Sequence, residues 1–183
     1  MRLFIIPFIF GFIFNADAQR PHYIDPLNLS WYDYTGQIDY SKQMTAYTSS
    51  FFLIGFTDPK HPTLNSIEIS IQFEPQKSFV DWQVLSKKSL GYQAYLFNHE
   101  RLHYYVTIIY GKKFKNYLIH NKIQQVMQLE KLRNQFAKEM QDYDDYYDAE
   151  TLHSYDTLKQ KLWDGIIMRG IDSLKNVTLD MPH

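Results

Sequence analysis

The chain has 183 residues, a length within the usual range for a single domain once a short leader is set apart. Hydrophobic residues make up 45% of it, including 15 Tyr and 13 Phe, so the composition excludes wholesale disorder. The formal net charge of -1, from 19 basic and 20 acidic residues, gives no long-range attraction to nucleic acid or anionic lipid, and we expect neither as a partner.

The N-terminus has the pattern of a signal peptide. Arg2 is followed by an apolar run over residues 3–14 and by small residues within 16–18 that fit a signal-peptidase site. The run is too short for a comfortable transmembrane span. We therefore assign residues 1–18 to a cleavable signal peptide and 19–183 to one mature domain without stable membrane insertion. Because the chain has no Cys, and hence no disulfides, we favour secretion to a bacterial periplasm or exterior.

The first half of the mature chain, residues 27–84, reads as β-strands separated by turns. The clearest strand covers 66–74, where an apolar residue at every odd position from 67 to 73 alternates with polar residues. This alternation is typical of a sheet with one buried and one wet face. A second strand region, 45–56, is rich in Thr, Tyr, Phe and Ile but alternates poorly.

After residue 89 the periodicity becomes helical, which predicts three helices at about 90–118, 121–144 and 151–174. Apolar stripes predict the buried faces of the last two helices. The stripe of the second helix consists of Leu129, Leu132, Phe136, Met140 and Tyr143, and that of the third of Leu158, Leu162, Ile166 and Gly170. Between these helices lies an acidic and aromatic segment, 142–148, which by itself is typical of a solvated helix end. The predicted fold is one α+β domain, with N-terminal antiparallel strands followed by three helices.

The first predicted helix contains the run His99-Glu100-Arg101-Leu102-His103, which has the form H-E-x-x-H. Residues four apart on a helix share a face, so both imidazoles can bind one tetrahedral zinc ion. Glu100 can then accept a proton from a metal-bound water that attacks a carbonyl. Apolar residues at helical spacing turn this face towards the interior: Leu96, Val106, Tyr110 and Phe114. We predict Zn²⁺ on His99 and His103 with Glu100 as the catalytic base; the competing interpretation is two core histidines satisfied by hydrogen bonds.

Catalytic zinc usually has three protein ligands and one open position, so a third ligand must come from another segment. Four histidines lie in loose segments or too far along the first helix: His22, His61, His183 and His120. His153 is favoured because it stands in the first turn of the third predicted helix, where Asp148 or Glu150 can hold its second nitrogen. Glu130 on the second helix competes with it, since a zinc-binding Glu downstream of H-E-x-x-H is a familiar arrangement.

With these segments identified, the chain resembles a bacterial family of secreted zinc-dependent proteases that is classed as a domain of unknown function. The resemblance rests on the H-E-x-x-H helix, on the run from Tyr147 to His153 before a helix that carries Trp163, and on the Trp, aromatic and Gly residues of 29–36. It implies a minimal zincin-like metallopeptidase arrangement and supports His153 as the third zinc ligand.

The chain departs from the family pattern at two places. Arg101 and Leu102 replace the small or amide residues often found inside the motif, and Ser154 follows His153 where Gly is common. Neither change removes a ligand or the base. The bulk of Leu102 bears on the shape of the cleft, so the substrates of relatives do not transfer to this chain.

The predicted function is therefore a secreted zinc-dependent metallohydrolase that cleaves a peptide or protein substrate. Tyr147 and Tyr155 flank His153 and are the candidate donors to the tetrahedral oxyanion. The alternative is a non-catalytic secreted binding or assembly protein in which the metal is structural or the site is vestigial.

Overall fold

The computed structural model describes residues 24–180, apart from residues 59, 62, 122 and 124–125. The predicted signal peptide, His22 and His183 lie outside the described residues. Within the described part of the chain, no helix has the combination of length and apolar character that crossing a bilayer requires.

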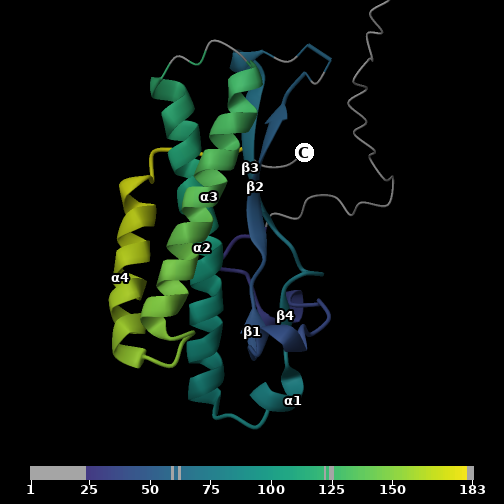
Figure 1. Ribbon diagram of the computed structural model, residues 1–183, viewed down its shortest axis with the longest axis vertical. Coiled ribbons are helices and arrows are strands. Elements are labelled where there is room, and N and C mark those ends of the chain that lie inside the picture. The colour runs from purple at the N-terminus through teal and green to yellow at the C-terminus, as the bar shows by residue number, and fades with distance from the viewer. Residues whose placement is uncertain (1–23, 59, 62, 122, 124–125, 181–183) are drawn as a thin grey trace, which may run out of the picture.

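The elements follow the predicted α+β order, with short antiparallel strands first and helices after them (Figure 1). The strands are β1 (Ala46–Tyr47), β2 (Ser50–Phe56), β3 (Ile67–Phe73) and β4 (Phe79–Val80). The helices are α1 (Trp82–Leu85), α2 (Leu90–His120), α3 (Val126–Thr151) and α4 (Thr157–Ser173). Three short 3-10 helices lie at Trp31–Asp33, Tyr40–Lys42 and Leu64–Ser66.

The strands form two separate antiparallel pairs. β2 pairs with β3 from Ser50 opposite Phe73 to the other end of both strands, and β1 pairs with β4. The strand predicted at 66–74 is confirmed as β3, whereas the region 45–56 is divided into β1 and β2. The division falls where Ser49 leaves the regular ladder and donates its backbone N–H to the Ser78 hydroxyl at 2.9 Å.

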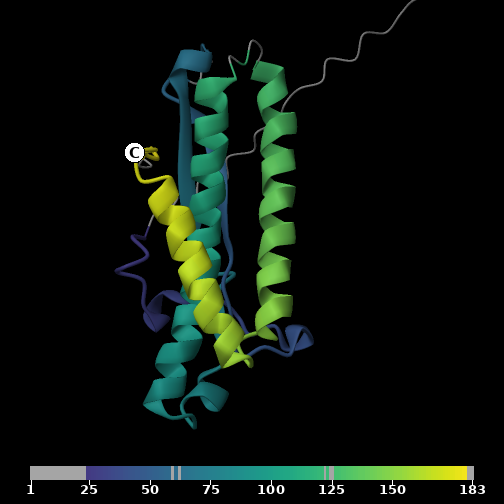
Figure 2. The same cartoon turned by 90° about the vertical axis from the view of Figure 1, so that its left-hand side faces the viewer.

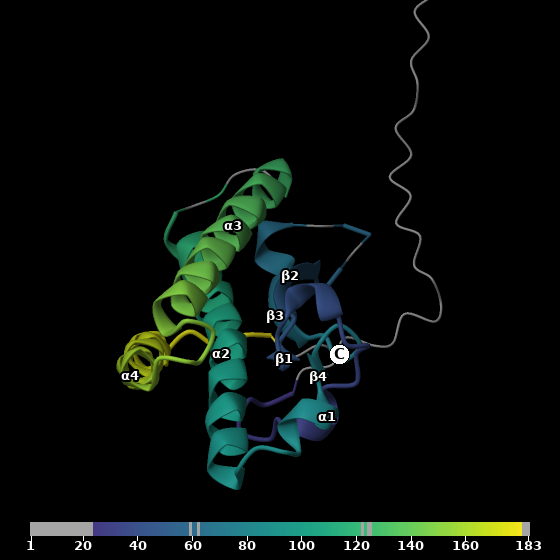
Figure 3. The same ribbon diagram turned by 60° about the horizontal axis from the view of Figure 1, so that its bottom comes forward.

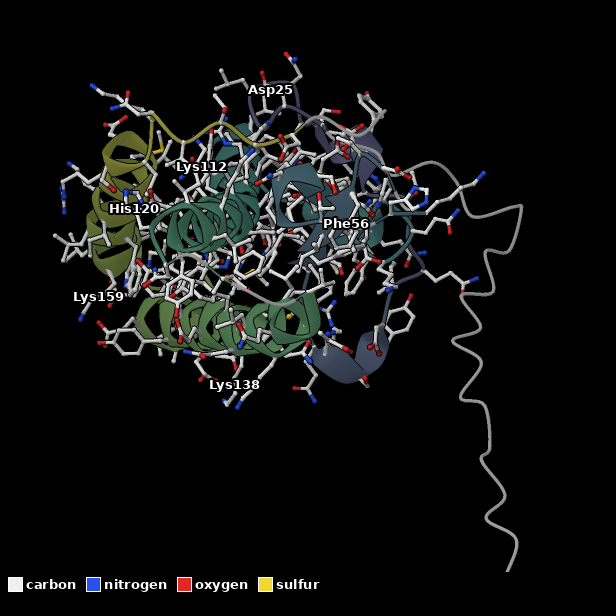
Figure 4. All side chains as sticks on the ribbon, turned by 90° about the horizontal axis from the view of Figure 1, so that it is seen from above. Asp25, Phe56, Lys112, His120, Lys138 and Lys159 are labelled. Atoms are coloured by element: carbon white, nitrogen blue, oxygen red, sulfur yellow. The ribbon has the colours of Figure 1, made fainter. Side chains whose placement is uncertain are left out.

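Helix α2 is the centre of the molecule. Its neighbours are the β2–β3 pair on one side and α3 and α4 on the others, as the views along and across the helices show (Figures 2 and 4). Every residue from 102 to 111 is buried, as expected for a helix covered on all sides. Gly111 permits the close approach to the sheet, because a Cβ atom there would collide with the side chain of Ile71.

The buried face predicted for the second long helix is confirmed in α3. Leu129 and Phe136 are buried, and the other three residues of the stripe pack against the core. Helix α3 continues through the acidic segment to Thr151, seven residues beyond its predicted end. One face of this continuation packs inside the molecule, since Tyr147 and Thr151 are fully buried, whereas Asp142, Asp145 and Tyr146 are exposed on the other face.

The buried face predicted for the third long helix is wrong for Leu158, Leu162 and Ile166, which are exposed, and holds for Gly170, which lies against Ile109 of α2. Leu158 is 78% exposed and Leu162 is 62% exposed, while the inward residues of α4 are Gln160, Trp163 and Ile167. The true inner face contains a polar residue in a buried position, so the apolar pattern is more continuous on the outer face than on the inner one.

The connection between α3 and α4 is a tight left-handed turn. Leu152, His153 and Ser154 have φ angles of 50°, 49° and 72°. The prediction that His153 lies in the first turn of a helix is therefore wrong: it lies between Thr151, the last residue of α3, and Thr157, the first residue of α4.

The chain after α4 crosses α2 and returns to the sheet (Figure 1). Lys112 Nζ donates to the carbonyl of Leu174 at 3.2 Å on the way. Asp180 then donates its N–H to Ile69 O at 2.9 Å and accepts the N–H of Ile69 at 2.7 Å. Lys115 Nζ contacts the same carboxylate at 2.7 and 2.8 Å. The end of the described chain is thus fastened to β3.

Candidate metal centre

The two histidines of the H-E-x-x-H motif lie one turn apart on the buried part of α2. His99 is 3% exposed and His103 is 8% exposed, so both imidazoles are shielded from bulk water. Their Nε2 atoms face each other at 3.3 Å. The motif therefore brings the two nitrogens together, as its spacing predicts.

Helix α3 supplies a third group to the same point. Oδ1 of Asp148 lies 3.2 Å from Nε2 of His99 and 3.2 Å from Nε2 of His103. One potential ligand atom from each of the three residues lies within 4.8 Å of the others. Although Oδ1 of Asp148 is buried, it has no partner with hydrogen-bond geometry among the described residues. A buried carboxylate oxygen in this state is unusual, because buried polar atoms are normally satisfied.

Each imidazole is held from its other side by an oxygen. Nδ1 of His99 lies 2.8 Å from Oε1 of Gln160 on α4, and Nδ1 of His103 lies 2.8 Å from Oδ1 of Asp144 on α3. Because both oxygens can accept a hydrogen bond, these contacts favour the tautomer with the proton on Nδ1, in which Nε2 of each neutral imidazole presents a lone pair. The lone pairs of the two imidazoles and of Asp148 consequently converge on one point. Oxygen partners on the outer nitrogens are the usual support of metal-binding histidines.

The cluster is strongly polarised. Burial opposes protonation of His103, but the carboxylates of Asp144 and Asp148 outweigh it and hold the pKa of this imidazole well above its usual range. Burial likewise opposes ionisation of Asp148, but the contacts from His103 and His99 hold the pKa of this carboxyl far below its usual range. The site therefore favours positive charge at its centre, whether a proton or a metal ion supplies it.

Tyr147 contacts His99 at Nδ1, the nitrogen that faces away from the point where the ligand atoms converge. Its hydroxyl lies 2.8 Å from Nδ1 of His99 and accepts a hydrogen bond from Nε2 of Gln160, also at 2.8 Å. The side chain is fully buried, and burial holds the pKa of the phenol well above its usual range, so the hydroxyl keeps its proton. This position favours a role in orienting His99 over the predicted role as an oxyanion donor. The other candidate, Tyr155, is 79% exposed and lines the cleft described next.

A cleft of about 660 Å³ opens onto the cluster. One wall is the segment 42–50, which includes β1, and the other is formed by residues of α3 between Met140 and Asp148. Its floor is the part of α2 that carries the two histidines and Glu100. Figure 3 shows β1 and the C-terminal part of α3 on either side of α2. The cluster is thus open on one side to a space large enough for a substrate segment.

Glu100 lies in the floor of this cleft and is held by a short chain of hydroxyl groups. Oε2 of Glu100 accepts a hydrogen bond from the Thr48 hydroxyl at 2.8 Å, and the Thr48 hydroxyl lies 3.0 Å from the Tyr34 hydroxyl. Burial raises the pKa of the Glu100 carboxyl, although the nearby imidazoles of His103 and His99 favour its ionised form. A raised pKa suits a group that must accept a proton near neutral pH.

The two residues that the sequence offers as third ligands occupy different places. His153 is at the edge of the cleft with its side chain 55% exposed, and its Nδ1 lies 3.2 Å from Oδ2 of Asp148. Among the described residues, the convergent group of ligand atoms does not include it. Glu130 is exposed on α3, about 27 Å along the helix from Asp148, and is not part of the site.

The remaining described histidines are also remote from the cluster. His61 is exposed and contacts Asp58, and His120 contacts the carbonyl of Asn116 at the end of α2. Neither lines the cleft.

The sequence also contains a pattern for the two aspartates of the site, which the H-E-x-x-H motif alone does not reveal. Asp144 and Asp148 are four residues apart, as are His99 and His103. Each pair occupies one face of a helix, and α2 and α3 pack together so that the two pairs meet. Gln160 and Thr48 carry no comparable signal, because a single amide or hydroxyl forms no pattern.

Comparison with protein-family models, with curated proteins and with solved structures finds no match to this chain. The resemblance to a family of secreted zinc-dependent proteases therefore stays a prediction.

Proposed function

We propose that this protein is a metal-dependent hydrolase in which His99, His103 and Asp148 bind one Zn²⁺ ion. The observation that carries the proposal is the convergence of three lone pairs, two of them fixed by acceptors behind the imidazoles, on a point where Asp148 Oδ1 has no hydrogen bond. Two imidazoles and a carboxylate form a ligand set typical of catalytic zinc. Asp148 replaces His153 as our proposed third ligand.

The reaction that this arrangement supports is hydrolysis by an activated water. A zinc ion held by His99, His103 and Asp148 would supply a water of lowered pKa and would polarise a carbonyl. Glu100 lines the cleft beside the two histidines and accepts the proton of the attacking water. Thr48 and the buried surroundings keep the carboxylate of Glu100 in place for that transfer.

The substrate class that we propose is a peptide. β1 pairs with β4 along one edge, and no other strand within the described residues pairs with it. The segment 42–50, which contains β1, lines the cleft beside the cluster. An extended peptide can add to such an edge through main-chain hydrogen bonds, which would lay a scissile carbonyl across the site. We therefore propose a zincin-like peptidase, and with the predicted signal peptide at 1–18, a secreted or periplasmic one.

Metal content provides the first test. Purified mature protein should hold about one zinc ion per chain by elemental mass spectrometry. The variants His103→Ala and Asp148→Ala should lose it, because each removes one of three ligands. His120→Ala is the matched control, since it removes an exposed α2 histidine that does not line the cleft and contacts the carbonyl of Asn116 on its own helix. A folded wild-type protein that binds no zinc when zinc is supplied would contradict the proposal.

The catalytic step needs a separate test. Glu100→Gln should retain the zinc ion but lose cleavage of peptide substrates in a screen, because an amide cannot accept the proton. Zinc-loaded wild type that cleaves none of the peptides, with a closed four-ligand metal shell, would favour the non-catalytic binding or assembly protein. Full activity of Glu100→Gln would exclude this mechanism.

A further inference from the structure

The turn between α3 and α4 places a histidine against the proposed zinc ligand at a cost in backbone energy. Leu152, His153 and Ser154 are consecutive, none is glycine, and all have φ angles between 49° and 72°. Residues other than glycine, asparagine and aspartate seldom adopt this left-handed conformation, and three in succession are rarer still. Strained backbone of this kind persists where the surrounding structure enforces it, and it is concentrated at functional sites.

Several hydrogen bonds enforce the turn. The N–H of His153 donates to Asp148 O at 2.9 Å, and the N–H of Asp156 donates to Thr151 O at 2.8 Å. From α2, the Tyr95 hydroxyl donates to the carbonyl of the buried Ser154 at 2.6 Å. The turn is therefore fixed from both ends and from the neighbouring helix.

The turn directs the His153 imidazole onto one oxygen of Asp148. Nδ1 of His153 lies 3.2 Å from Oδ2, whereas Oδ1 faces His99 and His103. One carboxylate oxygen of Asp148 thus contacts His153 at the edge of the cleft, and the other faces the point where the ligand atoms converge. A carboxylate held in this way offers a single oxygen in a fixed direction.

We propose that His153 is a positioning residue that orients Asp148 for metal binding, and that it is not itself a ligand. This inference rests on the proposed metal site. A contact on the outer atom of a ligand typically contributes a factor of 10–100 to metal affinity. This contact accounts for the strained turn, because the turn brings the His153 ring to the carboxylate of Asp148 on α3.

The variant His153→Gly tests the role of the imidazole, and Leu152→Gly is its matched control. Both substitutions place glycine at a left-handed position, and the side chain of Leu152 is largely exposed. We expect both metal-free variants to unfold at or above the wild-type temperature. Only His153→Gly should lose zinc affinity, by about 10–100-fold in competition with a chromophoric chelator. A lower unfolding temperature for His153→Gly alone would assign the imidazole to the fold and overturn the inference.

The variant His153→Asn separates positioning from ligation. The amide nitrogen of asparagine is attached to Cγ, as Nδ1 of histidine is, and asparagine tolerates the left-handed conformation. We expect His153→Asn to keep zinc affinity near the wild-type value and to leave the absorption spectrum of the Co²⁺-substituted protein unchanged. Affinity as weak as that of His153→Gly, with an altered Co²⁺ spectrum, would show that the imidazole is a ligand.

The wild-type protein in the same titrations distinguishes the two proposals. If the wild type binds zinc and His153→Gly binds it equally well, the inference about His153 fails and the metal site stands. If the wild type binds no zinc, the metal site fails and the role of His153 fails with it.

Discussion

Single residues of the site differ in how visible they are in the sequence. His99, Glu100 and His103 are recognisable because their spacing on one helix carries the chemistry. The residues that fix them are not, since Gln160 comes from another helix and Thr48 from the strand region. Each bonds to a motif residue more than 50 positions away in the sequence. Such pairings depend on the folded packing and leave no local pattern.

Thr48→Val should impair catalysis without removing the metal. The variant keeps the shape of the side chain but deletes the hydrogen bond to Oε2 of Glu100, so the carboxylate loses its fixed direction. We expect kcat to fall about tenfold, equivalent to ~1.4 kcal/mol, with metal content unchanged. Thr107→Val is the control, because Thr107 lines the same cleft but bonds to Ser50. An equal loss in both variants would point to general damage to the cleft.

At the level of elements, periodicity located all three long helices and the clearest strand. It failed at the ends of α3, which runs from Val126 to Thr151 and not from 121 to 144. The sequence predicts a solvated end for the acidic segment because its charges are visible, whereas their partners lie on α2, far away in the sequence. Two of those charges, Asp144 and Asp148, point inward to the histidines of α2. Because these charged residues belong to the site, the sequence pattern of the last turns of α3 resembled a solvent-exposed segment and not a packed helix.

Asp144→Ala should weaken metal binding, although Asp144 is not a proposed ligand. It holds Nδ1 of His103 at 2.8 Å, and loss of this contact leaves the imidazole free to rotate and to change its tautomer. We expect zinc affinity to fall about 10–100-fold in chelator competition. Asp145→Ala is the neighbouring control, since Asp145 bonds to Gln141 on the surface. Equal affinity for Asp144→Ala and the wild type would show that His103 needs no such support.

At the scale of the whole molecule, the sequence predicted the order of strands and helices but not how the last helix is oriented. Gln160 interrupts the inner face of α4 because it supports His99, whereas Leu158 and Leu162 are exposed. The return of the chain from α4 to β3 was also not predictable. It depends on contacts between Lys115, Ile69 and Asp180, which lie far apart in the sequence.

Lys115→Met should destabilise the fold measurably. The Nζ atom of Lys115 bonds both oxygens of Asp180, and the two side chains are only 20% and 31% exposed. We expect a loss of about 1 kcal/mol in the free energy of unfolding by urea titration. Lys138→Met should change the free energy of unfolding little, because the ion pair between Lys138 and Asp142, 2.8 Å long, lies on the open surface. Equal effects in the two variants would mean that the Lys115–Asp180 pair contributes no more than an ion pair on the open surface.

The segment that follows α4 also covers part of the free edge of β3, the edge that does not pair with β2. Asp180 occupies both the N–H and the carbonyl of Ile69 on the side of β3 that faces away from β2. Unpaired strands at a sheet boundary are templates for association between copies, and natural proteins block them with charge or with a covering segment. Here one acidic residue does both, at the middle of the strand. We expect a chain shortened before Asp180 to leave the N–H and the carbonyl of Ile69 unpaired at this edge of β3, where another strand could bind.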